Sequence, residues 1–96
     1  MRIITRRRLL EFSNRYRDAK EPLERWYRIM KLHEFETYSE LRQVFPSADK
    51  VGKLTIFNIG GNKYRLIVAI HYNREIVYIR DILTHNEYDK GKWKDK

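Results

Sequence analysis

The chain has 96 residues and a formal net charge of +8, from 21 Lys and Arg against 13 Asp and Glu. This length fits one domain, and 42% hydrophobic with 14% aromatic residues exclude a disordered chain. The absence of cysteine excludes disulfides and thiolate metal sites, and no stretch approaches the ~20 apolar residues of a membrane span.

The basic balance favours a polyanionic partner such as nucleic acid or the ribosome. The alternative is a basic surface that only confers solubility. Because the basic amino terminus is not followed by the apolar region of a secretory signal, we expect a cytoplasmic protein that does not bind a membrane.

The first half of the chain predicts one short strand and three helices. Residues 3–4 suffice for a strand, and Thr5 is a typical N-cap for the helix that follows. Pro22 suits the first turn of a second helix, whose apolar residues repeat at helical spacing. Residues 37–40 form a capping box that opens a short helix, which Pro46 ends. The residues after Pro46 are expected to form a loop.

In the second half the hydrophobic period changes to two, which predicts three strands over residues 54–59, 64–72 and 75–83. Thr84 and Glu87 form a second capping box that starts a last helical turn, and residues 90–96 are expected to be a basic, flexible tail. Hairpin-linked strands after a block of helices predict a single α+β domain over residues 1–96. We expect the N-terminal helices to cover one face of an antiparallel sheet.

The two turns of this sheet set which residues face each other. A two-residue second turn places Arg65 opposite Ile82 and diagonal to Arg80. The first turn allows two registers, with either Ile56 or Asn58 opposite Arg65. The helices should cover the apolar face, which comprises Phe57, Ile59, Tyr64, Leu66, Val68, Ile70, Val77, Ile79 and Leu83.

Arg65 is therefore expected on the open face, beside Asn58 and Arg80. Two neighbouring arginines repel each other unless an anion lies between them, and a guanidinium binds phosphate through two parallel hydrogen bonds. The alternative is a pair of solvated arginines that form salt bridges with Asp81, Glu75 or a carboxylate on a helix.

His85 and Tyr88 follow the last strand at the rim of this face. Thr84 as N-cap places His85 at the first helical position and Tyr88 one turn later on the same side. An imidazole can transfer a proton, a phenol can stack on a base or donate a proton, and Arg65 can stabilise a phosphoryl transition state. Together they predict metal-free RNA cleavage, although the spacing identifies no general base. The alternative is a capped helical turn whose His85 and Tyr88 only pack on the sheet.

Metal and cofactor sites are not expected. His33 and His71 are single histidines without partners at metal-ligand spacing. The segment "IGGNK" joins two strands, whereas a phosphate-binding P-loop needs a following helix and a Lys-Ser/Thr pair.

Four stretches of the chain resemble the HigB family of toxins from bacterial type II toxin–antitoxin modules: "MRIIT", "VFPSAD", "FNIGGNKYRL" and "YIRDILTHNEYD". The resemblance covers roughly residues 1–93. It implies a compact RelE-like α+β domain that cleaves translated mRNA in the ribosomal A site without metal. It also implies a HigA-type antitoxin with a helix-turn-helix, which neutralises the toxin. The toxin would associate with operator DNA only through this antitoxin.

The same resemblance places Arg65, His85 and Tyr88 at the suspected catalytic positions of the family. Asn58 and Lys63 are expected to contact RNA, and Arg80 joins them from the strand register alone. The competing interpretation is a non-catalytic basic RNA-binding module. A DNA-binding regulator is disfavoured because no helix-turn-helix spacing is evident.

Overall fold

The structure, a computed structural model, describes residues 1–95 and confirms the α+β class. These residues contain five strands, four α-helices and three short 3₁₀ turns (η), in the order β1 (Arg2–Ile4), α1 (Arg6–Arg15), η1 (Arg17–Ala19), α2 (Lys20–Leu32), α3 (Tyr38–Val44), β2 (Asp49–Val51), β3 (Leu54–Ile59), β4 (Tyr64–His71), η2 (Tyr72–Arg74), β5 (Ile76–Thr84), α4 (His85–Asp89) and η3 (Lys92–Asp95).

The strands form one sheet in the order β1-β5-β4-β3-β2, in which only the β1–β5 pair is parallel among the described residues. Strand β2 was not expected, because residues 49–51 were predicted as part of a loop. Two of its three residues, Asp49 and Lys50, are charged, and charged residues are common on edge strands. Such a strand has no hydrophobic alternation by which the sequence could reveal it.

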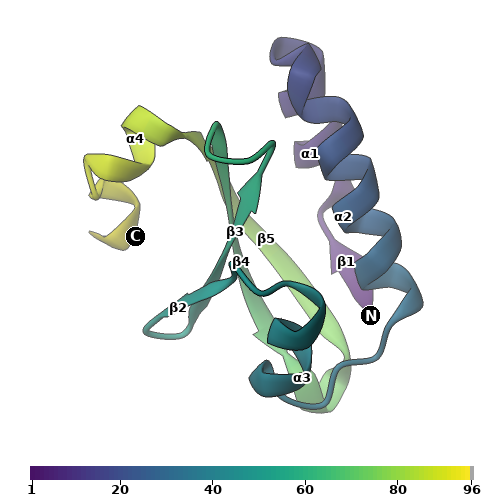
Figure 1. The fold of residues 1–96 in the computed structure, drawn as a ribbon. Coiled ribbons are helices and arrows are strands. Elements are labelled where there is room, and N and C mark those ends of the chain that lie inside the picture. Colours follow the sequence, from purple (N-terminus) through teal and green to yellow (C-terminus); the bar gives the residue numbers. More distant parts are fainter. Residues whose placement is uncertain (96) are drawn as a thin grey trace.

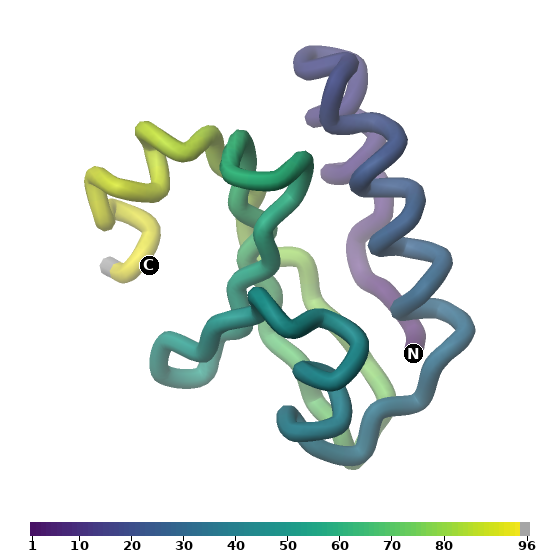
Figure 2. The backbone as a smooth tube through the Cα atoms, viewed as in Figure 1, coloured from purple at the N-terminus to yellow at the C-terminus, as the bar shows by residue number. Residues whose placement is uncertain are grey.

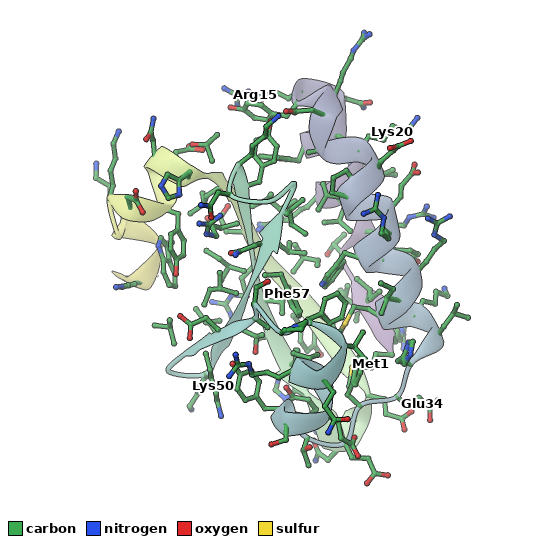
Figure 3. All side chains as sticks on the ribbon, viewed as in Figure 1. Met1, Arg15, Lys20, Glu34, Lys50 and Phe57 are labelled. Carbon is green, nitrogen blue, oxygen red and sulfur yellow. The ribbon has the colours of Figure 1, made fainter. Side chains whose placement is uncertain are left out.

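Helices α1 and α2 cover one face of the sheet, as Figure 1 shows. Helix α2 is amphipathic and buries Leu23, Trp26 and Met30 against the sheet. Phe57 lies between the sheet and the helices in Figure 3, with its ring 5.4 Å from that of Trp26 in an edge-to-face arrangement. Burying each such side chain contributes about 1.5–3 kcal/mol. Within residues 1–95, no helix has both the length and the apolar character that crossing a membrane requires.

The two predicted turns form as expected. The amide of Lys63 donates to the carbonyl of Gly60, and Asn58 pairs with Arg65, which selects one of the two registers left open by the sequence. Gly60 has a φ of +62°, a conformation that favours glycine. In the second turn, the amide of Glu75 donates to the carbonyl of Tyr72.

The register between β4 and β5 was predicted wrongly beyond Ile79. A β-bulge between Ile67 and Val68 leaves Arg80 unpaired, so that Arg65 faces Leu83 instead of Ile82. An extra residue in a strand reverses the alternation of every side chain after it. Ile82 accordingly packs in the main core between sheet and helices, and Leu83 packs on the opposite face.

The second face of the sheet is covered by the C-terminal segment that carries α4 and η3. Figure 2 shows this segment on the side of the sheet opposite α1 and α2. Trp93 is only 4% exposed and packs against Ile56 and Ile67. Arg65 lies on this face as expected, but it is 8% exposed rather than open to solvent. The flexibility expected of residues 90–96 stays a prediction.

Candidate active site

Arg65 in β4 is held by neutral oxygen atoms. Its guanidinium donates to the side-chain oxygen of Asn62 at 2.9 Å and to the carbonyls of Asn62 and Tyr64 at 3.2 and 3.1 Å. A guanidinium stays charged at any physiological pH, and these partners orient it without cancelling its charge. The alternative of a solvated arginine does not describe Arg65, because the side chain is buried.

His85 begins α4 and lies against Arg65. The capping box of Thr84 and Glu87 forms as predicted, and the amide of His85 donates to the carbonyl of Lys63 at 3.0 Å. The ring nitrogen Nδ1 lies 3.3 Å from a terminal nitrogen of Arg65, and Nε2 lies 3.1 Å from a carboxylate oxygen of Asp89. A neutral ring with its hydrogen on Nε2 accepts from Arg65 and donates to Asp89 at once.

Tyr88 lies one helical turn later and completes the group. The guanidinium carbon of Arg65 lies 5.5 Å from the centre of the Tyr88 ring, within the range of a cation–π contact. The other ring neighbour is Trp93, stacked at 4.9 Å with an interplanar angle of 13°. Burial and the nearby carboxylate of Asp49 raise the pKa of Tyr88, and Arg65 opposes them. The phenol therefore stays protonated at neutral pH and can donate a hydrogen bond.

Arg65 and Tyr88 open onto a hollow of about 400 Å³ between the sheet and the residues around α3. Asn58, whose RNA contact stays a prediction, also lines it. Arg42 from α3 and Asp49 from β2 line the same hollow and were not identified from the sequence. Asp49 was missed because β2 was predicted as a loop, and Arg42 is an exposed helical residue without a distinguishing pattern.

Lys63 and Arg80, the other two predicted RNA contacts, lie apart from this hollow. The side chain of Lys63 forms a 3.0 Å ion pair with Asp18 in η1. Arg80 lines a second hollow beside α1, because the bulge removes it from the neighbourhood of Arg65. The structure therefore brings together Arg65, His85, Tyr88 and Asn58 alone among the six predicted residues.

Asp18 fixes the turn that carries the partners of Arg65. Its carboxylate accepts a hydrogen bond from the hydroxyl of Tyr64 at 2.5 Å as well as the ion pair from Lys63. These hydrogen bonds, that of Tyr64 first, lower the pKa of Asp18. The same bond and burial of the ring raise the pKa of Tyr64 to about 12.

The hydrogen bond between Tyr64 and Asp18 predicts that the free energy of unfolding falls at alkaline pH. The Tyr64 proton is held more tightly in the folded chain, so its contribution is full below about pH 10 and is lost as the pH rises toward about 12. Tyr64→Phe should remove the contribution of the Tyr64 hydroxyl to the free energy of unfolding. The stability difference between wild type and variant should therefore shrink above pH 10. Urea unfolding from pH 8 to 11.5 measures it, and parallel curves for the two proteins would contradict the assignment. The Asp18 contribution has the opposite direction, being lost in acid as the pH falls through its lowered pKa.

The chemistry available in this group is that of charge stabilisation and proton transfer. Arg65 offers a fixed positive charge, His85 an exchangeable proton, Tyr88 a hydroxyl donor and Asp49 a carboxylate. Among residues 1–95, no group of three or more His, Asp or Glu side chains is arranged to hold a metal ion.

Comparison with known proteins gives consistent matches over most of the chain. The family described as HigB toxin, the RelE-like toxic component of a toxin–antitoxin system, matches residues 19–91. The chain is 32% identical over 92 residues to the mRNA interferase toxin HigB of Escherichia coli K12, covering 93% of this chain and 88% of that protein. It is 31% identical over 93 residues to the mRNA interferase HigB of Escherichia coli O6:H1, with coverages of 94% and 90%.

Proposed function

Because the chain belongs to the HigB family of RelE-like toxins from toxin–antitoxin systems, we propose that it is an mRNA interferase that cleaves translated mRNA and so inhibits translation. The observation that carries the proposal is the contact of Arg65 with both His85 and Tyr88 beside a hollow. An endonuclease that attacks through the 2′-OH of its substrate needs a cation for the phosphate and groups that move two protons. Side chains at this site supply both.

In this mechanism a base takes the proton of the 2′-OH, and the 2′-oxygen attacks the adjacent phosphorus. The bond to the 5′-oxygen breaks, and that oxygen leaves with a proton from an acid. Arg65 stabilises the charge that gathers on the phosphoryl oxygens, and His85, in its protonated form, is the acid that gives its proton to the leaving 5′-oxygen. Tyr88 stacks on the substrate or assists proton transfer. Asp49, which lines the hollow beside Tyr88, is the carboxylate we assign as base.

The partners follow from the same proposal. The substrate is mRNA in the A site of the ribosome, and the reaction takes place in the cytoplasm without a metal cofactor. A HigA-type antitoxin with a helix-turn-helix neutralises the enzyme. This antitoxin binds operator DNA, and the toxin associates with that DNA only through it. Asn58 contacts the RNA from within the hollow.

Inducible expression followed by primer extension on an abundant transcript tests the activity. New 5′ ends should fall inside translated codons and be absent from a copy of the transcript without a start codon. Attack by the 2′-OH leaves 2′,3′-cyclic phosphate and 5′-hydroxyl ends, whereas attack of water on the phosphorus with the 3′-oxygen as leaving group leaves 3′-hydroxyl and 5′-phosphate ends. Cuts that carry 5′-phosphates would exclude the 2′-OH route. Intact transcripts in the presence of folded protein would favour the non-catalytic RNA-binding module.

His85→Gln separates proton transfer from positioning. Glutamine keeps a polar side chain near Arg65 but cannot exchange a proton, so the cleavage rate should fall by about 10²–10⁴-fold. The pH dependence that belongs to the imidazole should disappear from the residual rate, measured from pH 5.5 to 8.5 in a reconstituted translation system. Asn86→Gln, a change at the neighbouring helical position, serves as control. An unchanged pH–rate profile in His85→Gln would show that another group transfers the proton.

A further inference from the structure

A second hollow, of about 550 Å³, lies between α1 and β5. Three arginines line it, namely Arg8, Arg15 and Arg80. Its apolar lining includes Ile67 and Trp93, the residues that pack together on the face of the sheet that carries Arg65. The hollow therefore combines fixed positive charges with an aromatic and aliphatic floor.

The β-bulge and the short β1 strand build this hollow. Strand β1 pairs with β5 only as far as Tyr78, so the edge of β5 beyond that point is left to α1. There the guanidinium of Arg8 donates to the carbonyl of Arg80, the extra residue of the bulge. Arg15, which is labelled in Figure 3, is the last residue of α1 and lines the same hollow.

The charges that face this hollow favour an anion. Its two carboxylates are Glu11, which accepts from Arg7 outside the hollow at 3.0 Å, and Asp81, which accepts from the amide of Ile82 at 3.0 Å. A smaller hollow of about 250 Å³ shares Asp81 and Trp93 and adds Lys90, Lys92 and the carboxylate of Glu87. Arginine side chains therefore outnumber carboxylates around the larger hollow, whereas two lysines and two carboxylates line the smaller one, so the charges of the larger hollow are the ones that favour a polyanion.

We propose that the hollow between α1 and β5 is a second RNA site, which holds a stretch of a single strand with successive phosphates on Arg15 and Arg80. A positively charged groove that follows the phosphate backbone is a common way to bind single strands without sequence preference. The choice of RNA rests on the proposed function. Trp93 connects the two sites, because its ring also stacks on Tyr88.

The test is the salt dependence of binding to a fluorescent, fully 2′-O-methylated octanucleotide, which lacks the 2′-OH needed for cleavage. Each phosphate contact to a single strand contributes roughly 0.7 to the slope of log affinity against log salt. The double variant Arg15→Gln/Arg80→Gln should therefore lower the slope by about 1.4, and Arg8 is left intact because it holds β5. The matched control is Arg25→Gln/Arg28→Gln, which removes the same charge from exposed positions on α2. Thermal unfolding of both variants confirms that each is folded.

A lower slope in the first variant alone supports the site. Equal changes in both variants would reduce the effect to net charge and overturn it, as would no change in either. Because the probe is not cleaved, the result is independent of the proposed function. If the wild-type chain makes no cuts but the salt-dependence slope falls in the first variant, the second RNA site is supported and the proposed nuclease function is not. If the wild-type chain cuts mRNA but the two variants give equal slopes, the nuclease function is supported and the second RNA site is overturned.

Discussion

Arg65→Ala is expected to lower the rate of mRNA cleavage by roughly 10²–10³-fold, the usual effect of removing one donor that stabilises charge in a transition state. Arg65 is a cation that contacts both His85 and Tyr88. Its loss removes the positive charge and also the contact between the guanidinium and Nδ1 of His85 that helps to orient the imidazole. The measurement is the single-turnover cleavage rate of a defined message in a reconstituted translation system. Growth inhibition on induction should fall in parallel.

Arg65 also ties the β3–β4 turn together, so the folding of each variant has to be measured separately. Its guanidinium bonds to the carbonyls of Asn62 and Tyr64, and alanine leaves both without that donor. Arg65→Lys keeps the charge but loses the planar fork, and should recover only a small part of the rate. Asn62→Ala keeps the arginine and removes the side-chain oxygen that orients it at 2.9 Å, and should lower kcat more than it raises KM.

Arg28→Ala, on the exposed surface of α2, is the matched control for loss of one positive charge. It should cleave at the wild-type rate. Full activity of a folded Arg65→Ala variant would remove Arg65 from the mechanism and leave it as a structural residue of the turn. Loss of activity only in proportion to the unfolded fraction would lead to the same conclusion.

The sheet was largely predictable because its apolar residues alternate and its turns contain glycine and asparagine. Phe57, Leu66 and Val77 all face the helices, as the alternation predicts. The exchange of Ile82 and Leu83 was not predictable, because both are apolar and fit either face. The bulge at Arg80 depends on α1 lying along the edge of β5, a contact between segments more than sixty residues apart.

The candidate site was predictable where local rules apply. The capping box fixes where α4 begins and so places His85 and Tyr88 one turn apart. Asp89 lies four residues after His85, a helical spacing that could have identified it. Asp49 and Arg42 had no such signal, because Asp49 reaches the hollow only through the pairing of β2 with β3, and Arg42 only through the position of α3 beside the sheet.

Trp93→Ala is expected to impair both stability and cleavage. Trp93 is 4% exposed, packs on Ile56 and Ile67, and donates from its indole nitrogen to the carbonyl of Tyr88 at 3.0 Å. Replacing a buried tryptophan by alanine costs about 3–5 kcal/mol, and we expect the lower end because this cluster is the smaller of the two. Urea unfolding measures the loss of stability. Cleavage should fall at least tenfold, because Tyr88 loses the ring that holds it beside Arg65.

Trp93→Phe is the matched control, because it keeps a stacking ring and loses only the indole donor, so cleavage should stay close to wild type.

Hydrogen exchange tests the same contact in the unmutated chain, since the amides of Gly91 and Lys94 donate to the carbonyls of Tyr88 and Gly91. If Trp93 anchors the segment, both amides should be protected, and Trp93→Ala should release them before the core of the sheet. Unprotected amides in wild type, with full cleavage by Trp93→Ala, would instead establish the flexible tail that the composition predicts. The active site would then have to be complete without residues 90–95, and the second RNA site would lose the floor that Trp93 provides.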